Sequence, residues 1–253
     1  MATTDAATTQ TDPTRGAAVA AGLFYLGTFV FSIPALGLYE GVLDDPAAFV
    51  LGAGSVQGAR WGGLIEILTA LTGIGTAVAL YPVIKRYGPA RAQGFVASRV
   101  LEAAMIFAGV LAVLSVVTLR QDAAGAGDTA TLTAAADALV AFKDWTFLLG
   151  PGLMASVNAA CLATIMFRSG LVPRIIPALG LVGAPLLLTS STVTLFGGWD
   201  QVSGPGLAMA LPIATWELSL GVYMVVKGFR RPVTAEPAVV VATPAGTLGA
   251  AIA

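Results

Sequence analysis

The chain has 253 residues, of which 57% are hydrophobic and 11% are charged, and its formal net charge is −1. Soluble domains carry about 25% charged residues, so this composition predicts a membrane protein. The lack of a basic surplus excludes a nucleic-acid partner. The single cysteine excludes an intramolecular disulfide, and the absence of histidine excludes histidine-ligated metal sites and Ser-His-Asp catalysis.

Six apolar stretches follow one another along the chain, and each is long enough to cross a hydrocarbon core of about 30 Å as a helix. They cover residues 17–39, 61–84, 94–119, 145–167, 175–196 and 207–229. The sequence therefore predicts an all-α protein, a polytopic transmembrane helical bundle of six spans. We expect residues 17–231 to form the membrane domain. The flanking segments, 1–16 and 232–253, are expected to be disordered because their composition is typical of low-complexity chain.

Lysine and arginine residues divide unequally between the two sides of the predicted bundle. One set of segments carries nine of them: Arg15, Lys85, Arg86, Arg91, Arg168, Arg174, Lys227, Arg230 and Arg231. The opposite set carries three: Arg60, Arg120 and Lys143. Cytoplasmic loops of membrane proteins carry the basic excess. This distribution predicts a multi-pass protein of the plasma membrane with both termini in the cytoplasm.

The second span carries a charged residue, Glu66, on a stripe of small and hydroxyl residues. The stripe comprises Gly62, Glu66, Thr69, Gly73 and Thr76, at helical spacing. A charge at the centre of a span adds about 2.5–3.5 kcal/mol to the free energy of insertion, so a compensating partner is expected. Either Glu66 lines a polar cavity, or the stripe is a helix contact in which Glu66 pairs with Lys143 or extends to the outer interface.

Spans three and six carry the remaining charges. Arg99 and Glu102 lie one turn apart and therefore face the same way, as in an internal ion pair. Glu217 lies near the middle of span six without a cation on its own helix. With Arg99 as the only basic residue deep within a span, two carboxylates remain uncompensated. Three solutions are open: a neutral carboxyl, a partner that reaches in from the rim, or a bound cation or water-filled cavity.

Span four begins at Asp144 and continues through Asn158, which shares a face with Pro151. The sequence Gly-Pro-Gly at 150–152 predicts a kink or local unwinding, which in membrane proteins either marks a binding site or is a harmless bend. The preceding segment, 132–143, has helical spacing and is expected to run into this span. Hydroxyl residues at 189–194 of span five are expected to bond back to helix carbonyls.

Several strings in the chain resemble a known family. They are GTAVALYPVIKR (75–86), VASRVLEA (96–103), DWTFLLGPGL (144–153), FRSGLVPR (167–174), LGLVGAP (179–185) and WELSLGVYMVVKGFR (216–230). Together they are similar to the membrane family called domain of unknown function 4386, over residues 22–230. The resemblance implies a six-helix integral membrane domain and implies no reaction. Arg99, Glu102, Asp144 and Glu217 lie within these strings, whereas Glu66 does not.

The candidate functional residues form an expected polar interior contributed by spans two, three, four and six. They are Glu66, Arg99, Glu102, Asp144, Asn158 and Glu217. The chain has no nucleophile–base pair and no metal-ligand spacing, so we predict no enzyme activity, no catalytic residue, no metal site and no cofactor. Our hypothesis is a protein that binds or moves a small solute or a proton through this interior. The alternative is a structural or interaction subunit whose charges only fix helix packing, with the lipid bilayer as partner in either case.

Overall fold

The computed structural model describes residues 14–123 and 129–230, where all regular secondary structure is helical. The elements are α1 (Arg15–Leu43), α2 (Pro46–Val50), α3 (Val56–Ile84), α4 (Pro89–Ala123), α5 (Thr129–Phe147), the π-helix η1 (Leu148–Met154), α6 (Ala155–Ser169), α7 (Ile175–Leu195) and α8 (Gly204–Val226). Helix α1 begins two residues before the predicted membrane domain. Of the two segments predicted to be disordered, 1–16 and 232–253, only residues 14–16 are among the described residues.

Six helices in the described part of the chain are long and apolar enough to cross a membrane. They are α1, α3, α4, α7, α8 and the continuous helix of α5, η1 and α6, so the prediction of an all-α bundle of six spans is confirmed. The largest difference in bounds is in the fourth span. It begins at Thr129 because the segment 132–143 is helical and runs into it, as expected. The cytoplasmic location of the termini stays a prediction.

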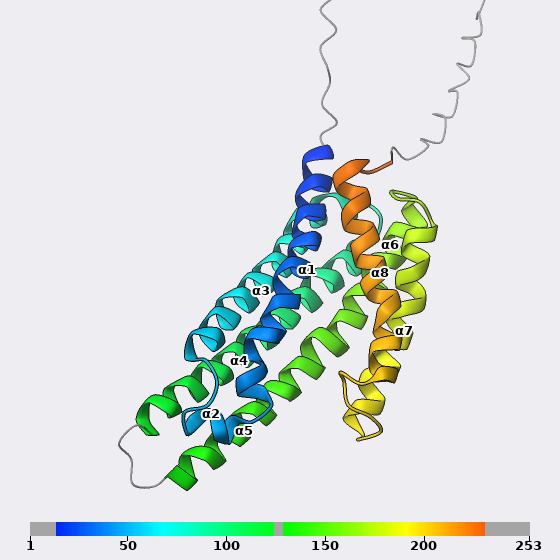
Figure 1. Cartoon of the computed structure of the whole chain (residues 1–253). Helices are drawn as coiled ribbons and strands as arrows, with labels where there is room; N and C mark the ends of the chain where they lie inside the picture. The colour runs from blue at the N-terminus through cyan, green and yellow to red at the C-terminus, as the bar shows by residue number, and fades with distance from the viewer. Residues whose placement is uncertain (1–13, 124–128, 231–253) are drawn as a thin grey trace, which may run out of the picture.

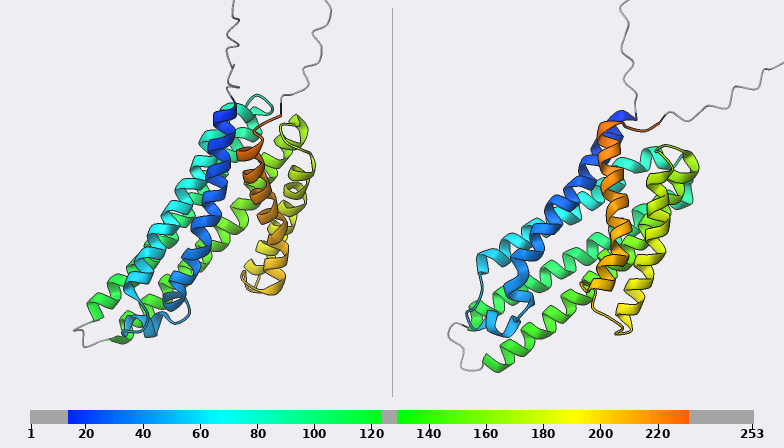
Figure 2. Two further views of the ribbon diagram at one scale, coloured as in Figure 1. Left: turned by 45° about the horizontal axis from the view of Figure 1, so that its top comes forward. Right: turned by 45° about the vertical axis from the view of Figure 1, so that its right-hand side comes forward.

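The six spans form a closed ring in chain order (Figures 1 and 2). Each span packs on the next, and α8 packs back on α1. Arg15 at the start of α1 donates a hydrogen bond to the carbonyl oxygen of Val225 near the end of α8, at 2.8 Å. The described chain therefore begins and ends at the same end of the ring, which we call the terminal end.

The two larger apolar clusters fill the ring above and below its middle, and a third, of Ala70, Ala103 and Ile106, lies between them at the cavity wall. The cluster at the terminal end is centred on Tyr25, Leu80, Phe95, Leu162 and Trp216, all at most 1% exposed. The cluster at the opposite end includes Tyr39, Phe49, Val113, Val116 and Ala136. Among the described residues this second cluster draws on α1 to α5, and α7 and α8 contribute nothing to it. The half of the ring between α1 and α8 therefore lacks an apolar filling away from the terminal end.

Arg120, near the end of α4, fixes the loop that follows α2. Its guanidinium donates hydrogen bonds to the carbonyl oxygens of Gly52, at 2.7 Å, and Ala53, and it lies 4.7 Å from the ring centre of Phe49. Gly52 has a φ of +120°, a conformation that favours glycine. One arginine thus holds α2 against the bundle through charge-assisted hydrogen bonds and a cation–π contact.

Helix α1 crosses α8 at two glycines, and this close approach gives a test of the ring closure. A Cβ atom on Gly22 would lie 2.7 Å from the carbonyl oxygen of Gly221, whereas a Cβ on Gly37 of the same helix would have nothing within 4 Å. Gly22→Val should therefore lower the free energy of unfolding by about 1–3 kcal/mol more than Gly37→Val does. Chemical unfolding in detergent micelles, followed by tryptophan fluorescence, measures both variants. Equal losses would contradict a tight α1–α8 crossing.

Candidate functional site

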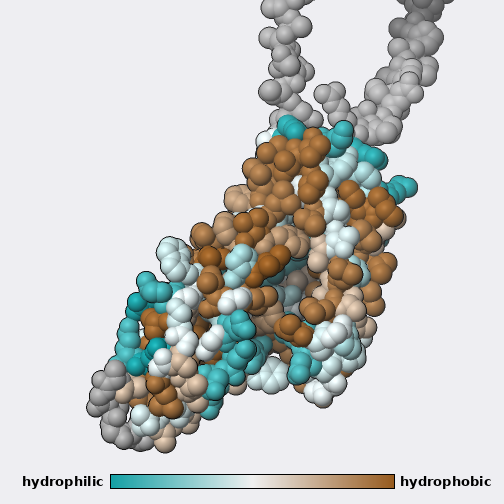
Figure 3. All heavy atoms as spheres, viewed as in Figure 1, coloured by the Kyte–Doolittle hydropathy of each residue, from teal (hydrophilic) through white to brown (hydrophobic). Residues whose placement is uncertain are grey.

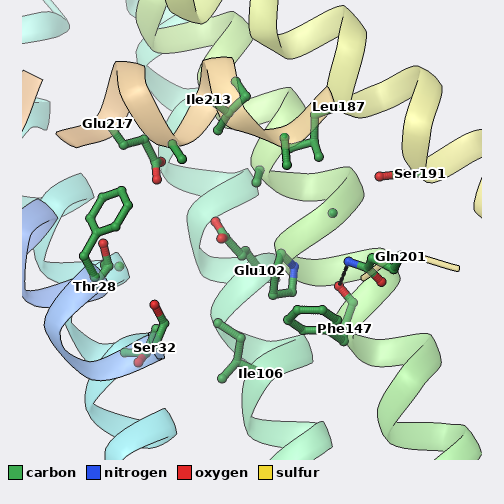
Figure 4. Close-up of a pocket in the computed structure, with 18 of the residues that line it drawn as sticks. Thr28, Ser32, Glu102, Ile106, Phe147, Leu187, Ser191, Gln201, Ile213 and Glu217 are labelled. Carbon is green, nitrogen blue, oxygen red and sulfur yellow. Dashed lines mark hydrogen bonds between the residues drawn. The ribbon is translucent and has the colours of Figure 1, made fainter. Parts of the chain in front are cut away.

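A cavity of about 320 Å³ lies inside the ring, between the two larger apolar clusters. Every span contributes to its wall, and most of the wall is apolar. Its charged residues are Glu66, Arg99, Glu102 and Glu217. Figure 4 shows Glu102 and Glu217 pointing into the same space, with Thr28 and Ser32 of α1 on one side and Gln201 on the other. The cavity therefore joins four predicted site residues to hydroxyls that come from other spans.

Arg99 on α4 is the centre of the charged cluster. It is 3% exposed, and its Nη1 donates to Glu102 Oε2 at 3.0 Å. Its Nη2 donates to Glu217 Oε1 on α8 at 2.6 Å, and the guanidinium carbon lies 5.2 Å from the ring centre of Tyr25 on α1. The pairing of Arg99 with Glu102 follows from their spacing of one helical turn. The bond to Glu217 crosses the ring, so one guanidinium serves two carboxylates.

Asn158 supports this cluster from α6. Its Nδ2 donates to Glu102 Oε2 at 2.6 Å, the same oxygen that accepts from Arg99. Asn158 is 1% exposed and lies behind the carboxylate, outside the cavity wall. The amide thus orients Glu102 while leaving the cavity side of the cluster free.

Glu66 forms a second ion pair, separate from the Arg99 cluster. Its Oε1 accepts a hydrogen bond from Lys143 on α5, the partner that the sequence offered if the stripe is a helix contact. Lys143 is 5% exposed and lies 5.5 Å from the ring centre of Tyr39. Its burial corrects our expectation that Arg99 is the only cation deep within a span. Lys143 precedes the apolar stretch 145–167, whereas α5 extends the fourth span and brings this side chain inside the bundle.

The charges inside the ring do not cancel. Glu66 and Lys143 neutralise each other, whereas Arg99 faces both Glu102 and Glu217. With all five groups ionised, the formal sum is −1 for this set. A bound cation, a cationic ligand group or one proton would neutralise that surplus. Glu217 lies at the cavity wall, so its carboxylate is accessible to any of the three.

Asp144 is the predicted site residue that the structure does not bring into this interior. Consecutive residues of a helix point about 100° apart, because one turn takes about 3.6 residues. With Lys143 facing inward, Asp144 is exposed and lines a neighbouring pocket on the rim, together with Trp145, Trp199 and Asp200. The five other predicted residues lie in or directly behind the cavity wall.

The Gly-Pro-Gly sequence produces the expected break in span four. Residues Leu148–Met154 form a π-helix that contains Pro151, and both Pro151 and Gly152 line the cavity. Proline has no N–H to donate to the carbonyl oxygen of Phe147, four residues earlier, and the i→i+5 register of the π-helix offers this oxygen the N–H of the next residue instead. Gln201 Nε2 donates to that oxygen at 3.3 Å, as Figure 4 shows. The break is thus stabilised by a side chain from the segment that joins α7 to α8.

Sequence reasoning missed the contribution of spans one and five to the cavity. Thr28 and Ser32 share a face of α1, and their i, i+4 spacing in an apolar helix was a usable signal. On α7, Thr192 bonds back to a helix carbonyl as expected, at 2.7 Å. Ser190 instead accepts from Trp199, and the hydroxyl of Thr194 is buried at the cavity without a hydrogen-bond partner.

The Arg99 cluster predicts a specific stability pattern. Arg99→Met should lower the free energy of unfolding by about 3–5 kcal/mol, because it leaves two buried carboxylates without a cation. The triple variant R99M/E102Q/E217Q should recover most of this loss, since no charge is then unpaired. Arg174→Met, at an exposed arginine, is the control. Chemical unfolding in detergent micelles measures all three. A triple variant no more stable than R99M would contradict the cluster.

Comparison with known proteins gives a family and no activity. No curated protein and no solved structure matches the chain. Residues 20–228 match one family, over a range that begins in α1 and ends just after α8. This range includes all of the first span except its first five residues, the other five spans and the whole cavity, and it confirms the resemblance seen in the sequence. The chain belongs to the family described as Domain of unknown function (DUF4386).

Proposed function

We propose that this protein binds a small cationic solute in the cavity inside its ring of helices, without catalysing a reaction on it. The observation that carries the proposal is the pair of carboxylates, Glu102 and Glu217, that share one guanidinium at the wall of a cavity of about 320 Å³. Ligand pockets are typically about 300–1,000 Å³, mostly apolar, with a few convergent polar groups. A positive charge placed there removes the negative surplus.

The proposal includes the setting of the site. The six spans support a multi-pass protein in a lipid bilayer. The excess of basic residues at the terminal end supports the plasma membrane with both termini in the cytoplasm. In this orientation the cavity lies from the middle of the bilayer toward its outer face. A proton would neutralise the surplus negative charge as well as a cationic solute does. Transport would additionally require that the site open to each side of the membrane in turn, so binding is the first step toward moving the solute.

A structural role is the second candidate, and one observation favours it. Each charged residue at the cavity wall has an ion-pair partner, so none of them needs a ligand in order to make a contact with an opposite charge. Such pairs can serve only to hold helices in register. This role does not account for the cavity, since a scaffold gains stability from an interior filled at crystal-like density.

Protection of a cysteine in the cavity tests the proposal. The background is Cys161→Ala with Thr69→Cys, because Thr69 lines the cavity, and the protein is studied in lipid nanodiscs. We expect butylammonium to slow labelling by N-ethylmaleimide, and butanol, its neutral analogue, to have no effect. Glu217→Gln should weaken this protection about 10- to 100-fold in apparent affinity, because it removes a charged acceptor. Glu40→Gln, on an exposed residue, is the matched control.

Three results would contradict cationic binding. They are a cavity cysteine that does not react at all, a rate that butylammonium leaves unchanged, and equal protection by butanol. The first result indicates a closed interior and favours the structural role.

A further inference from the structure

Helices α1 and α8 meet closely at the terminal end of the ring and then separate. They cross at Gly22 and Gly221, and Tyr25 of α1 packs beside this crossing. Beyond it the two helices diverge toward their other ends, in every view (Figures 1 and 2). The opposite apolar cluster draws on α1 to α5 alone within the described chain, so α8 has no part in the apolar packing at that end.

The cavity reaches the surface of the molecule between these two helices. Leu36 of α1 and Leu207 of α8 both line the cavity, and they are 52% and 56% exposed. Thr28 and Ala210 line it from the same two helices. Figure 3 shows the surface hollowed in this region, between α1 and α8. The cavity therefore has a lateral opening, bordered by the first and last spans.

This opening faces lipid rather than water. From Thr28 to Leu36 the helix rises about 12 Å, at about 1.5 Å per residue. Helix α1 runs from Arg15 to Leu43, so Thr28 lies near its middle and this length falls within one half of a hydrocarbon core about 30 Å thick. The residues at the opening, such as Phe29, Leu36 and Leu207, are apolar, whereas the carboxylates lie deeper. A molecule that lies in the opening between α1 and α8 would contact lipid acyl chains at its outer end and the carboxylates at its inner end.

We infer that the ligand of this site is a single-chain amphiphile with a cationic amine head, which enters from the bilayer through the opening between α1 and α8. Its ammonium group binds at Glu217 and Glu102, where the surplus negative charge lies. Its hydrocarbon chain follows Phe29 and Leu36 out into the lipid. An anionic head would add to the surplus, and a head without charge would leave it uncompensated. This inference rests on the proposed function and names its ligand class and route.

The test compares two amines in nanodiscs, with the cysteine at position 69 as reporter. Dodecylammonium should slow labelling by N-ethylmaleimide, and dodecanol, which enters the bilayer equally well, should not. Ala210→Trp places a bulky ring in the opening, so it should weaken protection by dodecylammonium at least about tenfold more than it weakens protection by butylammonium. Leu211→Trp is the matched control, because Leu211 is the next residue on α8 and is 64% exposed. It should change neither.

Ser32→Trp, on the α1 side of the cavity, repeats the test in case Ala210→Trp does not fold. The inference is overturned if dodecylammonium does not protect the cysteine, or if dodecanol protects it equally. It is also overturned if both tryptophan variants leave protection by dodecylammonium unchanged, or weaken protection by the two amines equally. In each of these cases, protection by butylammonium would still support the proposed function. If neither amine protects, the proposed function itself fails.

Discussion

The structure depends on the requirement that charge within a bilayer be compensated, and Arg99 is where this requirement is met. Its guanidinium binds Glu102 on its own helix and Glu217 on the opposite side of the ring, at 3.0 and 2.6 Å. A second ion pair, between Glu66 and Lys143, joins α3 to α5. These two connections cross the interior at places where apolar side chains would otherwise pack. They hold helices at a distance set by long polar side chains, and the cavity lies beside them.

The break in span four shows the corresponding requirement for the backbone, whose polar groups must be hydrogen-bonded within a bilayer. In hydrocarbon an unpaired carbonyl raises the free energy by several kcal/mol, so a proline in a span needs a substitute donor. The i→i+5 register of η1 offers one from the backbone, and Gln201, from the segment between α7 and α8, adds a side-chain donor to the carbonyl oxygen of Phe147. Irregular backbone is tolerated at membrane depth where it lines a cavity, and η1 does so through Pro151 and Gly152.

Local properties of the sequence predicted much of this fold. The six spans follow from apolar length, and the break in span four follows from Gly-Pro-Gly, because both are set by residues close together in the chain. The ion pairs that join helices across the ring could not be predicted from residues close together in the chain. Whether Glu217 faces Arg99 depends on the closure of the ring, which brings together residues 118 positions apart. The burial of Lys143 was missed because hydropathy detects the apolar stretch 145–167 and not how far the polar helix before it packs into the bundle.

The bond between Arg99 and the last span has a consequence for how the protein is synthesised and inserted into the membrane. The ribosome delivers Arg99 to the membrane 118 residues before Glu217. At about 5–20 residues per second this interval lasts about 6–24 seconds. During that time the arginine has Glu102, one turn away on the same helix, as its counter-ion. Glu102 therefore acts first as an insertion partner for Arg99. Only when α8 enters the bilayer does the nascent protein close into a ring, with α1 gaining its final neighbour last.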